Sequence, residues 1–295
     1  MSEAVGRANT IAIIGAGEMG AGIGRRLREC GASVITTLKE RSPASIERAR
    51  HAGLETVEDD DRLAREAAFI LSIVPPGEAA EVAQRYREPI GRAAEKPIFA
   101  ECNAISPAAA RAIAGLLEPT GCRYVDAGIV GLPPPEGRRD GGPRIHVCGP
   151  HAGAMMRLRD FGLDVAMVDG PIGAASALKL GHAGIVKGLI ALGAVMAETA
   201  SREGFAEALG EEIGRSQPQL AAWLRRTIPH MFPKAYRWVA EMEEIARFVG
   251  EDRPEAGIYR AAAEFFRQVA ERHAVSGSAE LDRLADFLAP GKSNG

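Results

Sequence analysis

Residues 10–24 read TIAIIGAGEMGAGIG and join an isoleucine-rich run directly to three spaced glycines. Gly15, Gly17 and Gly20 follow the pattern G-x-G-x-x-G, and a helical pattern continues after them. A strand, a glycine turn and a helix N-terminus in this order can bind the pyrophosphate of a dinucleotide, because free N–H groups and the helix dipole attract the anion. Gly15 suits the tight turn, Gly17 leaves room for phosphates, and Gly20 lets the helix lie close on the strand. The pattern predicts dinucleotide binding, with a purely structural turn as the alternative.

Charge and cysteine content argue against several other classes of protein. The net charge of −3 over 295 residues gives no reason to expect nucleic acid or an anionic membrane as partner. The four cysteines are widely spaced and form no C-x-x-C pair, so we expect buried thiols and neither a metal site nor a redox dithiol. The chain opens without a signal-peptide pattern. A reducing cytoplasm is therefore the expected location. The cysteines are Cys30, Cys102, Cys122 and Cys148.

The longest apolar run covers residues 188–197 and lies between Lys187 and Glu198. This run is too short to cross a bilayer, which requires about 20 apolar residues. We therefore expect it to form a buried helix.

The first half of the chain alternates short apolar runs with helical patterns. Ser42-Pro43 and Ser106-Pro107 each place a capping residue before a proline that suits the first helical position. This alternation predicts an α/β Rossmann domain, a mostly parallel, doubly wound sheet with helices on both faces. Beyond Gly170 only helical patterns occur, so we expect an all-α C-terminal domain, with residues 1–170 and 171–295 as the two domains. The expected strands are residues 11–15, 33–38, 68–74, 97–101, 124–127, 144–148 and 164–168.

Residues 173–204 read as one long interdomain helix whose first half is rich in glycine and alanine. Glycine inside a helix costs up to about 1 kcal/mol relative to alanine. We therefore expect a backbone or a ligand to pack very close to this face. Lys179, His182 and Lys187 lie among these small residues.

Lys179 is the strongest catalytic candidate, because a lysine with small neighbours near a domain junction can approach a substrate oxygen. Its ammonium group can donate to a carbonyl as hydride arrives, and its neutral form can take the proton of an alcohol. A solvated lysine on an outer helix face is the alternative.

The segment after the second expected strand bears on the choice of cofactor. Lys39, Arg41 and Ser42 favour the 2′-phosphate of NADP. Glu40 favours NAD, because an acidic residue here accepts from the ribose hydroxyls. We expect NADP(H) to be preferred, with NAD(H) possible, and a charged solvated turn as the alternative.

Five segments, in order and over nearly the whole chain, resemble the β-hydroxyacid dehydrogenases, relatives of 3-hydroxyisobutyrate and 6-phosphogluconate dehydrogenases. The resemblance is to the branch known as 6-phosphogluconate dehydrogenase-like, with a distinct all-helical C-terminal domain. The segments are Gly15-Ala16-Gly17-Glu18-Met19-Gly20, Val74-Pro75-Pro76, Glu101-Cys102-Asn103-Ala104-Ile105-Ser106-Pro107, Asp126-Ala127-Gly128-Ile129-Val130-Gly131 and residues 173–179.

This resemblance implies roles for particular residues. It implies that Glu18 and Met19 in the glycine loop contact the cofactor, as do Val74, Pro75 and Pro76. It further implies that Lys179 is catalytic and that the substrate contacts are Gly128, Ile129 and Val130.

Four positions depart from the family pattern. Val130 stands where the family has a serine that binds a substrate carboxylate, and Ala183 replaces the usual asparagine. Glu243-Glu244 occupy the place of a Lys-Asp pair. These departures imply a substrate that is bulkier, or less dependent on a carboxylate clamp, than a simple 3-hydroxy acid.

Several other residues keep alternative interpretations. His182 assists Lys179, binds substrate or is a core histidine, and Lys187 binds an acidic group near the cleft or lies on the helix surface. Asn103 contacts the nicotinamide or substrate, or else caps a strand end. Tyr236 and Trp238 are expected in the core or at a dimer interface.

The sequence thus predicts an NAD(P)-dependent oxidoreductase that transfers hydride between nicotinamide and a small hydroxy or oxo compound, with Lys179 as acid and base. The resemblance implies a homodimer built on the long helix and the C-terminal domain. An imine reductase on the same fold remains an alternative, although such enzymes usually have Asp or Tyr at the lysine position. A cofactor-binding sensor without turnover is the other alternative.

Overall fold

The computed structural model describes residues 6–138, 140–277 and 284–289. The chain divides into two compact units, residues 1–179 and residues 180–295. Each unit has its own apolar core.

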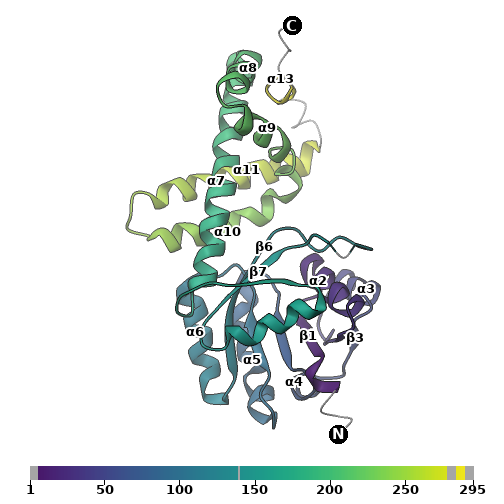
Figure 1. The fold of residues 1–295 in the computed structure, drawn as a ribbon. Helices are drawn as coiled ribbons and strands as arrows, with labels where there is room; N and C mark the ends of the chain where they lie inside the picture. The colour runs from purple at the N-terminus through teal and green to yellow at the C-terminus, as the bar shows by residue number, and fades with distance from the viewer. Residues whose placement is uncertain (1–5, 139, 278–283, 290–295) are drawn as a thin grey trace. The chain divides into compact units, whose positions relative to one another are not determined.

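The N-terminal unit contains an eight-stranded sheet in the order β3-β2-β1-β4-β5-β6-β7-β8 (Figure 1). All neighbouring strands are parallel except β6 and β7, which are antiparallel. The predicted Rossmann architecture is confirmed. The sequence did not reveal β3, which has only two residues, both exposed. The strands are β1 Thr10–Ile14, β2 Ser33–Thr36, β3 Glu55–Thr56, β4 Phe69–Ser72, β5 Ile98–Glu101, β6 Arg123–Val130, β7 Arg144–Cys148 and β8 Asp164–Met167.

Helices cover both faces of this sheet, because alternate residues of each strand project to opposite sides. One face packs against α2 (Glu18–Glu29), α3 (Pro43–His51) and the 3₁₀ segment η3 (Ala152–Phe161). The other face packs against α4 (Asp60–Glu66), α5 (Ala79–Arg92) and α6 (Pro107–Leu117). Short 3₁₀ turns, η1 (Pro76–Glu78) and η2 (Glu118–Thr120), precede α5 and follow α6.

The two predicted Ser-Pro helix starts are confirmed. The Ser42 hydroxyl accepts from the Ser45 N–H at the start of α3, and the Ser106 hydroxyl accepts from the Ala109 N–H at the start of α6. Each proline occupies the first turn, where its missing N–H costs nothing.

The long helix α7 spans Ala174–Glu203, close to the predicted 173–204. The compact units divide inside it, after Lys179, whereas the sequence placed the boundary near residue 170. The physical reason is that Asp126 of β6 binds the backbone N–H groups of Gly173, Ala175 and Ser176. The first turns of α7 are thereby fixed to the sheet.

In the C-terminal unit, all secondary structure within the described residues is helical. Its core includes Phe232, Met242 and Phe266, and the Trp238 ring packs edge-on against Phe266 with centroids 5.2 Å apart. Trp238 therefore lies against the core, whereas Tyr236 is 66% exposed. The elements after α7 are α8 Ala206–Ser216, α9 Pro218–Thr227, η4 Phe232–Lys234, α10 Ala235–Val249, α11 Ala256–Ser276 and α13 Ala285–Leu288.

The small residues of α7 allow close packing within this unit. A Cβ at Gly193 would lie 2.5 Å from Leu224 Cδ2, and one at Gly184 would lie 3.2 Å from the Tyr259 ring. The close neighbour predicted for the first half of α7 is therefore present at Gly184, where it is a side chain of α11 and not a backbone or a ligand.

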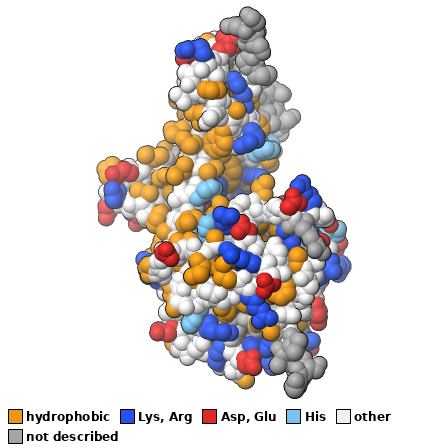
Figure 2. Space-filling model, viewed as in Figure 1, with side chains coloured by type: hydrophobic (Ala, Val, Ile, Leu, Met, Phe, Trp, Pro, Cys, Tyr) orange, Lys and Arg blue, Asp and Glu red, His pale blue; other side chains and the backbone are white. Residues whose placement is uncertain are grey.

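The expectation of a buried helix at residues 188–197 holds for one side of α7 only. Ile185, Leu189, Leu192 and Met196 are 42–65% exposed and follow helical spacing along one side. Hydrophobic side chains gather over this unit in Figure 2. By length and composition alone α7 could span a membrane. Its most apolar 18-residue stretch has a mean hydropathy of 1.6, and 39% of that stretch is buried. Its opposite side, however, contributes Ile190, Ala194 and Ala197 to the core, as expected of a core helix.

Candidate active site

The glycine loop between β1 and α2 has the geometry of a phosphate cradle. Gly15 has φ of +96°, and a Cβ there would lie 2.2 Å from the Ile73 carbonyl oxygen. A Cβ at Gly20 would lie 2.0 Å from the Gly15 oxygen, so only glycine allows this approach of helix and strand. A Cβ at Gly17, the N-cap of α2, would meet nothing within 4 Å. The loop therefore fits the pyrophosphate of a dinucleotide. Glu18 and Met19 form the first turn of α2.

Basic side chains follow the end of β2 in the chain, and one of them contacts this loop. Arg41, which is half-buried, pairs with Glu78 at 3.4 Å, and Ser42 caps α3. Lys39 is exposed. Arg48 of α3, which the sequence argument missed, donates from Nε to the Ala16 carbonyl of the glycine loop at 3.1 Å. Arg48 is half-buried, as Arg41 is, and its hydrogen bond brings its guanidinium group against the loop.

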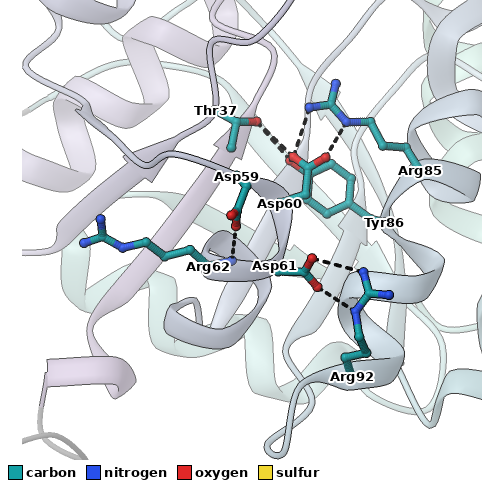
Figure 3. Close-up of polar contacts among 8 residues, drawn as sticks. All are labelled: Thr37, Asp59, Asp60, Asp61, Arg62, Arg85, Tyr86 and Arg92. Carbon is teal, nitrogen blue, oxygen red and sulfur yellow. Dashed lines mark hydrogen bonds and ion pairs between the residues drawn. The ribbon is translucent and has the colours of Figure 1, made fainter.

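A buried polar network fixes the chain just after β2 (Figure 3). Arg85 donates to both carboxylate oxygens of Asp60, at 2.6 and 3.0 Å, and the Tyr86 hydroxyl donates at 2.7 Å. Thr37 donates to the same carboxylate at 3.3 Å. Burial favours a higher pKa for Asp60, but the hydrogen bonds from Arg85 and Tyr86 outweigh it and lower that pKa. The carboxylate therefore stays charged and holds Thr37 in place.

Asn103 joins the ends of β4 and β5. Its Oδ1 accepts from the Val74 N–H at 2.7 Å, and its Nδ2 donates to the Ser72 hydroxyl at 3.2 Å. Both ends of the amide are therefore engaged, which is the predicted strand-end cap. A nicotinamide contact by Asn103 stays a prediction. Val74 is buried, and Pro75 and Pro76 lead from it into η1.

Asp126 is fully buried in the middle of β6 and anchors the start of α7. Its carboxylate accepts from the N–H groups of Gly173, Ala175 and Ser176 at 2.9–3.2 Å. It also accepts from the Ser176 hydroxyl at 2.5 Å and the Cys148 thiol at 3.1 Å. A carboxylate at a helix N-terminus satisfies the free N–H groups and complements the helix dipole.

Gly128 lets α7 lie directly on β6. A Cβ at this position would lie 2.7 Å from the Ala175 oxygen and 3.0 Å from Lys179 Cβ. Gly128 faces the same side of the sheet as Asp126, two residues earlier in the strand. The predicted catalytic Lys179 and the predicted substrate residue Gly128 are thus adjacent within the N-terminal unit.

Glu101 at the end of β5 is the other charged group beside Lys179. Burial raises the pKa of Glu101 to about 7, against hydrogen bonds from Asn103 that lower it. Burial lowers the pKa of Lys179 to about 8, while Cys102 and Glu101 act in the opposite direction. The amine can therefore change its protonation state close to neutral pH, as an acid–base catalyst requires.

The other two predicted substrate residues of β6 face opposite sides of the sheet. Val130 shares the face of Gly128 and is half-buried. The side chain of Ile129 belongs to the core under α2, so only its backbone is available at the face of Lys179.

His182 and Lys187 lie in the C-terminal unit. His182 is exposed. Lys187 forms an ion pair with Glu241, and its Nζ lies 5.2 Å from the centroid of the Trp238 ring. These contacts account for the charge of Lys187, and its binding of an acidic group stays a prediction.

The four cysteines are free, with Cys102 and Cys148 buried and Cys30 and Cys122 half-buried. Among the described residues, no cluster of His, Cys, Asp and Glu is arranged to bind a metal.

Asp126, Glu101, Ser176 and Arg48 are the residues near the site that the sequence argument did not select. Asp126 and Glu101 each begin a segment that carried the family resemblance. An acidic residue near the end of a predicted strand was the signal that could have identified them. Arg48 gave no comparable signal, because it is one of two arginines on α3.

Comparison with known proteins agrees with this geometry. Residues 10–156 match the model of the NAD binding domain of 6-phosphogluconate dehydrogenase, and residues 200–269 match a domain of unknown function, DUF1932. A conserved protein of unknown function, MTH1747, described as structurally similar to 3-hydroxyacid dehydrogenases, is 27% identical. Its TM-score is 0.70, and the match covers 93% of this chain and 99% of that one.

Two more distant structures share the fold. The 3-hydroxyisobutyrate dehydrogenase of Mycobacterium tuberculosis, solved with L-serine, is 19% identical, with a TM-score of 0.67 and coverage of 94% and 97%. The imine reductase of Myxococcus stipitatus, solved with NADP⁺, is 18% identical, with a TM-score of 0.55 and coverage of 95% and 100%. The matched domains and the shared fold place the chain in the 3-hydroxyacid dehydrogenase superfamily, in the branch that joins an NAD-binding domain of the 6-phosphogluconate dehydrogenase type to a DUF1932 helical domain.

Proposed function

We propose that this protein is an NADP(H)-preferring oxidoreductase that interconverts a hydroxyl and a carbonyl group, with Lys179 as its acid–base catalyst. The observation that carries the proposal is the placement of Lys179. It lies against Gly128 on the face of β6 that also holds Asp126, and burial lowers its pKa to about 8.

The residues of the N-terminal unit define how such a reaction proceeds. When bound, the cofactor supplies or accepts a hydride at its nicotinamide ring. The N–H groups at the start of α2 hold its pyrophosphate. In the direction of reduction, the Lys179 ammonium group donates a proton to the carbonyl oxygen. In the direction of oxidation, the neutral Lys179 amine takes the proton of the hydroxyl group.

The substrate is a compound whose recognition depends little on a carboxylate clamp. Val130 is apolar and shares the face of Gly128, and it offers no hydrogen bond from its side chain. The residues that follow β6 are apolar as well, including Leu132, which is 70% exposed. We therefore expect an apolar group next to the reacting carbon.

The preference for NADP(H) rests on Arg41 and Arg48, with Lys39 and Ser42 beside them. Guanidinium groups bind phosphate through paired, charge-assisted hydrogen bonds. Glu78 pairs with Arg41 at 3.4 Å and so competes with a phosphate for this guanidinium group.

The homodimer is retained as part of the proposal. The exposed apolar side of α7, formed by Ile185, Leu189, Leu192 and Met196, is suited to burial against a second copy. A location in the cytoplasm accords with four free cysteines.

The decisive experiment measures NADP-linked activity on a panel of hydroxy acids, oxo acids, aldehydes, ketones and cyclic imines, for the wild type and for Lys179→Ala. Loss of one general acid–base group lowers a rate by about 10²–10⁴-fold, so the variant should lose its turnover while NADPH binding stays nearly intact. Near-normal rates in the variant contradict the proposal.

The same panel separates the alternatives. A protein that reduces cyclic imines and no carbonyl compound is an imine reductase, although Lys179 argues against that activity. A protein that binds NADPH tightly and turns over no compound is a sensor.

A further inference from the structure

Four polar side chains lie in register across neighbouring strands at one edge of the sheet. Ser72 of β4 is paired with Glu101 of β5, Glu101 with Asp126 of β6, and Asp126 with Cys148 of β7. Paired residues of adjacent strands project to the same face, so the four form one row. All four are buried. Buried polar groups nearly always have hydrogen-bond partners, and each member of the row can be examined for its own.

Three members of the row have hydrogen-bond partners for their side chains. Ser72 accepts from the amide of Asn103, Asp126 accepts from the start of α7, and Cys148 donates to Asp126. Glu101 differs from them. Its Oε1 accepts from the Asn103 N–H at 2.8 Å, but its Oε2 has no hydrogen-bond partner among the described residues.

Ionisable groups surround Glu101 on several elements. Asp126 and Tyr124 of β6 and Cys102, just after β5, interact electrostatically with it, and Cys148 of β7 ends the row. Burial raises the pKa values of Cys102, Cys148 and Tyr124 above their usual ranges, so these three groups are neutral near pH 7. Asp126 adds a negative charge that disfavours a second one beside it.

Lys179 is a cation that interacts electrostatically with Glu101 and Cys102. Its Cβ lies against Gly128, on the face of β6 that carries Asp126, and Asp126 is the strand partner of Glu101. The hydrogen bonds from Ala175 and Ser176 to Asp126 fix α7 one turn before Lys179. The base of the lysine side chain is therefore held close to the row.

We propose that Glu101 is a positioning residue that acts through Lys179. Its carboxylate is the counter-ion of the Lys179 ammonium group and determines the charge state in which that amine meets the substrate. The inference rests on the proposed function for its catalytic meaning, but the pairing of the two groups can be tested without turnover.

The first test follows the charge of Lys179 directly by NMR. The ¹³Cε signal of isotopically labelled lysine is titrated against pH in the full-length wild type and in Glu101→Gln, with Lys179→Arg used to assign the signal. Because the carboxylate favours the ammonium form, the variant should lower the midpoint of Lys179 by about one pH unit or more. Glu101→Asp keeps the charge, so the midpoint of Lys179 in this variant should stay close to that of the wild type. Exposed Glu118 gives the matched control, Glu118→Gln, which should leave the midpoint unchanged.

An unchanged midpoint in Glu101→Gln overturns the proposal. If that variant does not fold, the wild type decides the matter. Two interacting groups titrate in two steps, so the Lys179 signal should show a second inflection from the ionisation of Glu101. A single inflection overturns the proposal as well.

The second test uses the pH profile of the reaction. In the direction of reduction, the alkaline limb of kcat should move to lower pH in Glu101→Gln by the same amount as the NMR midpoint, and Glu101→Asp should bring it back. A purely structural role for Glu101 would lower kcat without moving the limb, which contradicts the proposal. If no substrate is turned over but the midpoint shifts, the proposed function fails and the pairing stands. If turnover is present but the midpoint does not shift, the proposed function stands and the pairing of Glu101 with Lys179 fails.

Discussion

Two regions of the sheet, one around β1 and β2 and the other around β5 and β6, differ in the sign and the burial of their charged residues. Around β1 and β2, the candidate cofactor residues Lys39, Arg41 and Arg48 are exposed or half-buried and basic. Around β5 and β6, Glu101 and Asp126 are fully buried and acidic. An exposed charge is screened by water and contributes mainly to the affinity for an anionic ligand. A buried charge must be satisfied by the fold itself, so it contributes to stability and alters the protonation of its neighbours.

The largest effect on stability should come from Asp126→Ala. The substitution leaves three buried N–H groups and the Ser176 hydroxyl without their acceptor, and we expect it to lower the free energy of unfolding by about 3–5 kcal/mol. Urea unfolding followed by circular dichroism measures this change. Asp160→Ala, at an exposed position of η3, is the control and should change it by less than about 0.5 kcal/mol. Equal stability of the two variants would show that Asp126 does not anchor α7.

The second prediction concerns how stability depends on pH. Because the pKa of Glu101 is raised to about 7 in the fold, its protonated form is favoured there. The contribution of Glu101 is complete at pH values below the unfolded pKa near 4.5 and is lost as the pH rises through about 7. Glu101→Gln should therefore gain stability relative to the wild type over this interval, by at most about 3 kcal/mol. Unfolding curves at intervals between pH 4.5 and 8 test it, and a constant difference between the two proteins contradicts it.

The third prediction concerns the basic residues around β1 and β2. Arg41→Ala and Arg48→Ala should each weaken NADPH binding by about 10- to 100-fold, because each removes a charge-assisted hydrogen bond to phosphate. NADH binding should change much less, and neither variant should lose stability on the scale of Asp126→Ala. Fluorescence titration with both cofactors measures the effect. Arg50→Ala, on the exposed side of α3, is the matched control. Equal losses for NADPH and NADH would refute the assignment.

The smallest expected effect is that of a substitution at Val130, at the end of the strand that contains the buried Asp126. Val130→Ser restores the hydroxyl group that the related dehydrogenases are expected to use for a substrate carboxylate. A single added hydrogen bond should raise kcat/KM for 3-hydroxy acids by about three- to tenfold. Assays with 3-hydroxy acids and with a neutral alcohol distinguish this gain from a general effect. A decline with both substrates would mean that Val130 has another role.

The local patterns of the sequence were sufficient for the fold. The glycine loop, the alternating apolar runs and the Ser-Pro helix starts each act within one turn or one strand, so they can be read from neighbouring residues. The glycines in the first half of α7 likewise predicted close packing, which Gly184 and Tyr259 show. The same patterns led to Lys179 through the family resemblance. They missed β3, because two exposed residues carry no periodic signal.

Tertiary structure alone decided how the buried charges are partnered. Asp126 and Ser176 are 50 residues apart, yet their hydrogen bond fixes the start of α7 and moves the division between the units to Lys179. The register of β5 with β6 places Glu101 beside Asp126, and burial among the packed elements is the main cause of the altered pKa values of Glu101 and Lys179. Desolvation depends on everything that packs around a group, whereas a motif specifies only the residues next to it in the chain. The sequence by itself therefore determined a dinucleotide-binding fold with a candidate lysine, and the packing of sheet against helix determined the electrostatic environment in which that lysine acts.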